Sequence, residues 1–226
     1  MPQYPPCTLE RVWEAHGLPV LRAAIDLPAP AESSRIRKFY ALQSRAYLRY
    51  CESFLLPRAT AEAERCLEGS RPFHPHQAEL TGRVTFQEGP LLSLRVQSRE
   101  EGEGIFLQHR GDTWDLAAGT PVSLGQFLQK PRRWKRLFYE AASADMDRRI
   151  RCCALPCRED WRRALRRSLN PRNFYLTEEG LAFFVPMYAL GDTSLGVPTF
   201  LLPWREENCV KVKLPPETGG SFQKHP

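Results

Sequence analysis

The sequence contains no hydrophobic run long enough to cross a membrane. Although 42% of its 226 residues are hydrophobic, no apolar stretch approaches the roughly 18 residues that a transmembrane helix needs. The first residues, MPQYPPCTLERVWEAHG, lack a basic segment followed by an apolar one, so no signal peptide is expected. On this basis we expect the chain to be soluble and cytoplasmic.

The familiar catalytic motifs are absent as well. The chain contains no Gly-x-Ser-x-Gly elbow, phosphate-binding loop, dinucleotide fingerprint or His-Glu-x-x-His helix. It has 5 histidines, one of them in the C-terminal tail. The sequence therefore predicts a non-catalytic protein without a cofactor. The alternative is a small enzyme assembled from distant residues such as His74, His109 and Asp112, which requires a pocket that brings two of them within hydrogen-bonding distance.

The cysteine count argues against a disulfide framework. Seven scattered cysteines in a chain of this length fit a reducing compartment better. Cys152, Cys153 and Cys157 lie close together in the sequence, but a zinc site would need a second ligand pair, for which His74 and His76 are the available candidates. We interpret the three cysteines as small residues at a corner between helices and predict no metal site. A redox or metal role for them stays open.

Hydrophobic spacing in the first third of the chain predicts strands followed by helix. Apolar residues recur at three- and four-residue steps over residues 36–54, which is typical of an amphipathic helix. Ser33 or Ser34 can cap its start. Pro57 then begins a second, short helix, and Gly69 ends it.

The middle of the chain reads as antiparallel strands, and the last part as helices followed by strands. Strand-like runs joined by turns occupy residues 79–124. Helices are expected at 131–151 and 158–169. Three apolar runs within 173–204 supply the final strands.

This order of elements predicts an α+β fold, with a mostly antiparallel β-sheet and two to four helices packed on one face. We expect one domain at residues 9–206. Residues 1–8 and 207–226 are expected to be flexible termini.

Positive charge is concentrated in one region. Residues 130–172 hold 14 Lys and Arg against 5 Asp and Glu. Within 158–169, one helical face is apolar and the opposite face carries four arginines: Arg162, Arg163, Arg166 and Arg167. Such a face is typical of a solvated surface helix. An acidic protein partner, a nucleic acid or an anionic lipid is the alternative, and nucleic acid is not the favoured partner.

Four segments resemble one domain family in the same order along the chain. They are GLPVLRAAIDLP, LLSLRVQSRE, DTWDLAAGTPVSLGQFL and FYLTEEGLAFFVPMYALGDTSLGVPTFLLPW. The family comprises the extracellular, lysozyme-sensing domain of the anti-sigma-V factor and the related non-catalytic module of peptidoglycan deacetylases. The resemblance implies a non-catalytic binding or sensor-like domain, whose ligand by analogy is a cell-wall component or a protein. It also implies relatives that are exported or membrane-anchored.

Two loops are the candidate binding sites. The loop at 188–198, YALGDTSLGVP, joins two predicted strands and is punctuated by glycine and proline, and loops on rigid scaffolds commonly carry recognition. At 100–106 this chain has EEGEGIF where many family members have Tyr-Thr-Gly-Gly-Ala-His. The predicted binding residues are Tyr188, Asp192, Ser194 and Leu195 in the first loop, and Glu101 and Glu103 in the second. The sequence does not indicate an oligomeric state.

Overall fold

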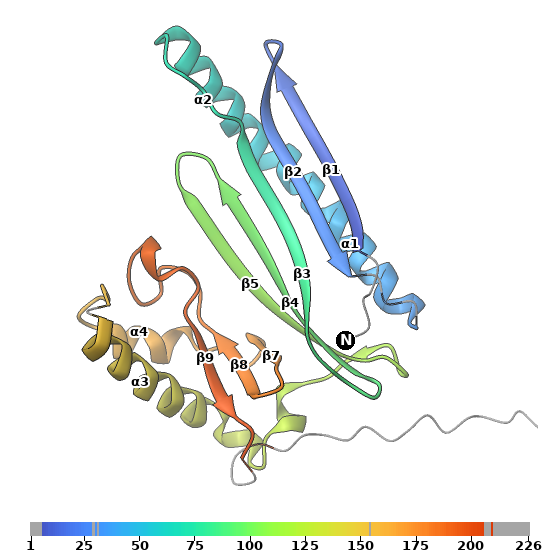
Figure 1. The fold of residues 1–226 in the computed structure, drawn as a ribbon, viewed down its shortest axis with the longest axis vertical. Helices are drawn as coiled ribbons and strands as arrows, with labels where there is room; N and C mark the ends of the chain where they lie inside the picture. The colour runs from blue at the N-terminus through green and yellow to red at the C-terminus, as the bar shows by residue number, and fades with distance from the viewer. Residues whose placement is uncertain (1–5, 29, 31, 154, 206–208, 210–226) are drawn as a thin grey trace, which may run out of the picture.

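The fold is α+β, as predicted, and its strands form two sheets (Figure 1). The structure is a computed structural model that describes residues 6–28, 30, 32–153, 155–205 and 209. The predicted domain limits, 9–206, stay a prediction. Most of the predicted termini lie outside the described residues, although the first strand begins at Pro6.

Six strands form the larger sheet, and they lie in the order in which they occur in the chain. All neighbours are antiparallel except β2 and β3, which are parallel. The strands are β1 (Pro6–Ala15), β2 (Leu18–Pro28), β3 (His76–Glu88), β4 (Leu91–Glu101), β5 (Ile105–Asp115) and β6 (Thr120–Pro121).

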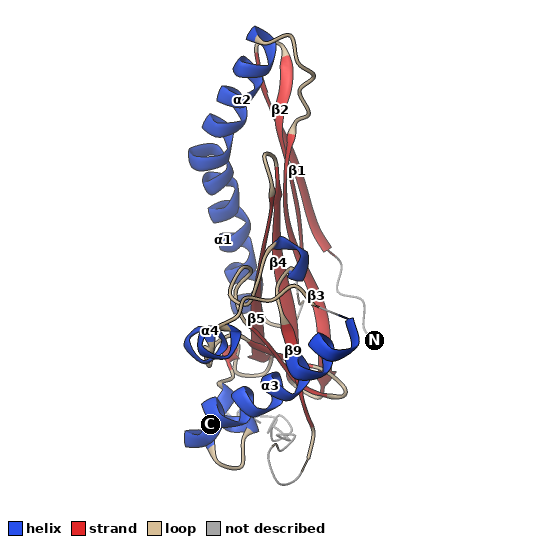
Figure 2. Ribbon diagram, turned by 90° about the vertical axis from the view of Figure 1, so that its left-hand side faces the viewer, coloured by secondary structure: helices blue, strands red, loops and turns tan. Residues whose placement is uncertain are grey.

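A long helical crossover joins the parallel pair, because parallel strands cannot be connected by a tight turn. It consists of α1 (Ser34–Tyr50), the π-helical segment η1 (Cys51–Leu55) and α2 (Leu56–Glu68). The Ser33 hydroxyl accepts from the Ile36 N–H, which confirms the predicted cap. Figure 2 shows the crossover running along the larger sheet. Alternate residues of β4, Leu92, Leu94 and Val96, are buried beneath α1.

The smaller sheet consists of β7 (Phe174–Leu176), β8 (Gly180–Phe184) and β9 (Thr199–Pro203), all antiparallel. It packs with α3 (Trp134–Cys153) and α4 (Trp161–Ser168) around a second core, in which the rings of Phe138 and Phe183 stack 4.0 Å apart. Three short 3₁₀ turns complete the elements: η2 (Leu124–Phe127), η3 (Pro131–Arg133) and η4 (Thr193–Leu195).

Phe86 and Leu91 of the larger sheet belong to the same core as the smaller sheet. Beside these apolar contacts, the two sheets meet through backbone and small polar side chains. The Ser93 hydroxyl, fully buried on β4, accepts from the Leu176 N–H at 2.9 Å and bonds to the Thr113 hydroxyl at 2.9 Å. On β5, a Cβ placed on Gly111 would lie 1.6 Å from the Phe174 carbonyl oxygen. β7 therefore crosses β5 at a point where only glycine fits.

Candidate functional site

Two loops far apart in the sequence meet at the turn between β4 and β5. A cavity of about 480 Å³ there is lined by the predicted residues Tyr188, Glu101 and Glu103, and by residues of α2. An adjoining cavity of about 310 Å³ lies under α1. Glu100 and Phe106 line both. We call the two cavities together the hairpin groove.

The helical wall of the groove contains an irregularity. Between α1 and α2 the chain stays helical but widens into the π-helical segment η1, in which the Leu56 N–H bonds to the Cys51 carbonyl. Pro57 explains this, because it cannot donate to the Ser53 carbonyl and its ring would collide with that group in a regular α-helix. The predicted helix ending near 54 and the predicted helix beginning at Pro57 are therefore one continuous rod. Segments of this kind are often found at functional sites.

Tyr188 occupies a backbone conformation that side chains avoid. It is the third residue of a turn closed by the Ala189 N–H and the Pro186 carbonyl, and its φ is +67°. Glycine or asparagine usually fills such a position. The residue is 47% exposed, and its hydroxyl donates to the Ile105 carbonyl at 3.4 Å. A bulky residue that is both strained and exposed points to a role for its side chain in function.

Substituting Tyr188 tests the strain directly. Tyr188→Gly is expected to be more stable than Tyr188→Ala by about 1 kcal/mol, because both lose the ring but alanine keeps the left-handed strain. Urea denaturation of the two variants measures the difference. Equal stability would show that the turn relaxes and stores no strain.

The other predicted residues of this loop make contacts within the loop or with the core. The Asp192 carboxylate accepts from the Ser194 N–H at 2.9 Å and from the Ser194 hydroxyl at 2.6 Å, and these bonds lower the pKa of Asp192. Leu195 packs against the core of the smaller sheet. Neither cavity of the groove is lined by these three residues. Their predicted binding role stays a prediction.

Glu100 and two tyrosines of α1 are groove residues that the sequence reasoning missed. The Tyr50 hydroxyl donates to Glu100 Oε2 at 3.2 Å, and the Tyr47 hydroxyl donates to the Glu79 carbonyl at 3.0 Å. Burial, then the neighbouring Glu100, raises the pKa of Tyr50 to about 12, so its phenol stays a proton donor. The signal was available in β4, whose buried face, every second residue from Leu92, ends in Glu100.

The three residues of the alternative enzyme are not brought together. His74 is exposed, in the segment before β3. His109 and Asp112 lie on opposite faces of β5: the His109 ring bonds to Gln97 and contacts Phe184, while Asp112 faces α1. Burial, then the nearby Arg95, lowers the pKa of His109 to about 4.

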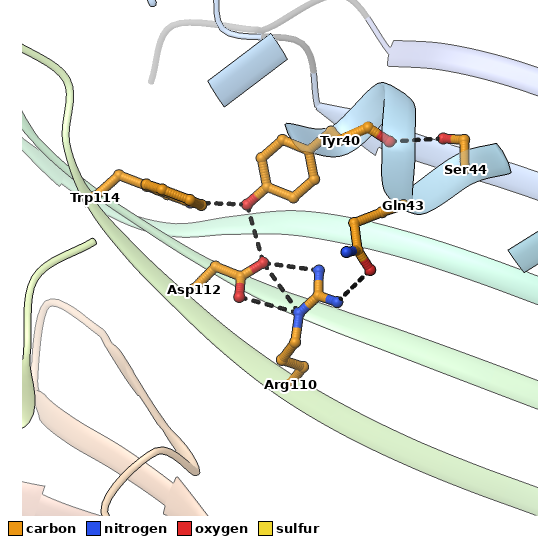
Figure 3. Close-up of polar contacts among 6 residues, drawn as sticks. All are labelled: Tyr40, Gln43, Ser44, Arg110, Asp112 and Trp114. Carbon is orange, nitrogen blue, oxygen red and sulfur yellow. Dashed lines mark hydrogen bonds and ion pairs between the residues drawn. The ribbon is translucent and has the colours of Figure 1, made fainter. Parts of the chain in front are cut away.

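Asp112 belongs instead to a hydrogen-bonded cluster that joins β5 to α1 (Figure 3). Its carboxylate accepts from the Tyr40 hydroxyl at 3.1 Å and from Arg110 through two nitrogens, Nε to Oδ1 at 3.0 Å and Nη2 to Oδ2 at 2.9 Å. Arg110 also donates to Gln43, and Trp114 donates to the Tyr40 hydroxyl. These bonds tie Asp112 to Tyr40 of α1 and to Arg110 of β5, which is the pattern of a structural clasp.

The candidate metal ligands are also separated. His76 is paired with Glu62 of α2 and lies against Gly102. Cys152 is exposed and Cys157 partly buried, both as free thiols, and the side chain of Cys153 lies outside the description. No group of three or more potential metal ligands occurs among the described residues.

The arginine face of α4 is partly occupied by intramolecular contacts. Arg162 forms an ion pair with Asp147 at 2.6 Å, and the guanidinium of Arg166 lies 4.5 Å from the centre of the Tyr139 ring. Within the described part of the chain, Arg163 and Arg167 have no ion pair. Use of this face by an anionic partner stays an untested alternative.

Two crystal structures resemble the chain over almost its full length. One is a member of the DUF3298 family from Bacteroides fragilis, with a TM-score of 0.65 and 12% identity, and the match covers 92% of this chain and 94% of that chain. The other is a DUF3298 family protein from Pseudomonas aeruginosa, with a TM-score of 0.59 and 14% identity, covering 91% and 93%. The chain has the DUF3298 fold.

The DUF3298 fold supports a domain of unknown function and names no ligand. At these identities the likeness shows the fold alone. No family model matches the sequence, and no curated protein matches it. In the part of the chain that the structure describes, no helix is both long and apolar enough to span a membrane.

Proposed function

We propose that this chain is a non-catalytic binding domain that recognises a protein partner at the hairpin groove. One observation carries the proposal. Three aromatic side chains are exposed among the described residues, and all three gather at the groove: Phe106 and Tyr188 line it, and Phe54 stacks on Tyr50 at its edge. Exposed aromatic clusters are typical of protein interfaces.

The sequence resemblance points the same way. Similarity to the sensing domain of the anti-sigma-V factor and to the module beside peptidoglycan deacetylases favours binding over catalysis. In the larger cavity of the groove the histidine, His76, is held by Glu62, which argues against its use as a free base. A cell-wall ligand and a cytoplasmic location remain parts of the prediction that await their own tests.

A photo-crosslinking residue at position 188 tests the proposal. Benzoylphenylalanine in place of Tyr188, in the native cells, is expected to give a discrete covalent adduct on irradiation. The same residue at position 12 is the matched control, since Val12 is 53% exposed on β1, the strand at the far edge of the larger sheet. Mass spectrometry of the adduct identifies the partner.

Competition makes the result specific. An excess of unlabelled wild-type chain is expected to abolish the adduct, whereas the Tyr188→Gly variant is expected to leave it, because that variant lacks the ring that the partner contacts. Adducts of equal yield at positions 188 and 12, or none at position 188, would contradict the proposed function.

A further inference from the structure

Glu100 differs from the other acids that line the hairpin groove. Glu101 forms an ion pair with Arg99 at 3.0 Å, and Glu103 forms one with Arg65 at 2.8 Å. Glu100 has no ion pair among the described residues, and its bonding partner is the neutral hydroxyl of Tyr50. Among the acids that line the groove, Glu100 is therefore the one without an ion-pair partner in the described part of the chain.

Glu100 is partly buried, and no cation among the described residues forms an ion pair with it. In the sheet Glu100 lies opposite Phe106 on one side and the fully buried Ala78 on the other. Burial is the main reason that the pKa of Glu100 is raised, and the hydrogen bond from Tyr50 and the charge of Arg58 act against that rise. Arg58 lines the larger cavity but does not reach ion-pairing distance. A carboxylate that is partly removed from water gains stability when a cation comes within ion-pairing distance.

The groove has walls that suit a cation. The rings of Tyr47 and Tyr50 stack 6.1 Å apart, and those of Tyr50 and Phe54 stack 5.5 Å apart. Phe106 of β5 lines the same cavity as the two tyrosines. Aromatic faces attract ammonium and guanidinium groups. Cavities of about 310 and 480 Å³ lie within the range of about 300–1,000 Å³ that is typical of small-ligand pockets.

We infer that the hairpin groove receives a lysine or arginine side chain of the protein partner, with the Glu100 carboxylate as its counter-ion and the tyrosines of α1 as its wall. This inference rests on the proposed function and specifies its chemistry. The exposed side chains of Ile105, Phe106 and Tyr188 would surround the charge pair and exclude water from it. Residues around the centre of many interfaces act in this way.

A small cationic probe tests the inference without the partner. The ¹⁵N-labelled chain is titrated with N-acetyl-arginine methylamide and, as a neutral analogue of the same shape, N-acetyl-citrulline methylamide. The arginine probe is expected to shift the amide signals of Glu100 and Phe106 in a saturable way and to bind about tenfold more tightly than the citrulline probe.

Two substitutions with opposite expected effects on probe binding separate a charge effect from a structural one. Glu100→Gln, which keeps the acceptor for Tyr50, is expected to weaken the arginine probe about tenfold. Arg58→Gln, which removes a competing positive charge, is expected to strengthen it. Glu140→Gln is the matched control, because Glu140 is exposed on α3 and paired with Arg136, and it should leave binding unchanged.

The outcomes separate this inference from the proposed function. Equal binding of the two probes, or binding that is insensitive to both Glu100→Gln and Arg58→Gln, would overturn the cation site while the crosslink at position 188 still stood. If Glu100→Gln failed to give a dispersed spectrum, Arg58→Gln would decide the matter, because it leaves Glu100 in place.

Discussion

Replacing Asp112 by alanine is expected to lower the free energy of unfolding by about 3 kcal/mol. The Asp112 side chain is 10% exposed and accepts from Tyr40 and Arg110 (Figure 3). Without it, the hydroxyl of Tyr40, whose side chain is buried, loses its acceptor, and the Arg110 guanidinium is left beside the Phe39 ring without its counter-charge. Both losses weaken the contact between α1 and β5.

Urea denaturation measures the loss of unfolding free energy, and it is compared with a control variant and with a double-mutant cycle. Glu140→Ala removes one partner of an exposed ion pair and is expected to cost at most about 1 kcal/mol. In a double-mutant cycle, Asp112→Ala is expected to cost less unfolding free energy in a Tyr40→Phe background, because phenylalanine has no hydroxyl donor that could be left without an acceptor. A loss below about 1 kcal/mol, or strict additivity, would show that the clasp contributes little.

The helical half of the fold could be predicted because its signals are local. Ser33 caps α1 as expected, and the apolar steps from Ile36 to Cys51 follow the face that packs against the sheet, whereas Phe54 is exposed. The π-helical segment could not be predicted in this way. A proline after an apolar helix is equally compatible with the start of a new helix and with a distorted turn inside one continuous helix. Packing against the sheet selects the continuous helix.

The division into two sheets has no local signature. β5 presents Gly111 and Thr113 on the face that turns away from α1, and a strand with small and polar residues there is expected to face solvent. In the molecule that face is covered by the backbone of β7, which is held by the buried Ser93 hydroxyl. A surface covered by main chain needs no large apolar side chain, so hydrophobic patterning does not reveal it.

Only part of the candidate site could be predicted from the sequence, for a similar reason. Tyr188 was singled out by loop composition, and Glu101 and Glu103 by their position in a divergent segment. Their meeting at one cavity depends on contacts across more than eighty residues, such as that from Tyr188 to Ile105. Glu100 was overlooked because it stands among several acids, and only its neighbours distinguish it.

Gly111→Ala is expected to destabilise the protein by about 3 kcal/mol or more. The added Cβ would lie 1.6 Å from the Phe174 oxygen and 2.4 Å from its carbonyl carbon. Both obstructing atoms are main chain, so no side-chain rotation relieves the clash. β7 must move away from β5, and the bond from the Leu176 N–H to the Ser93 hydroxyl is lost with it.

Gly104→Ala is the matched control for this substitution. Gly104 lies in the turn that joins β4 to β5, and nothing lies within 4 Å of a Cβ placed there, so its effect is expected to stay within about 0.5 kcal/mol. Hydrogen exchange locates the damage of Gly111→Ala. Amides of β7 and β8 are expected to lose protection before those of β2 and β3, because the contact between sheets fails while the larger sheet keeps its helical cover. Uniform loss of protection in both sheets would instead show that the two cores unfold as one unit.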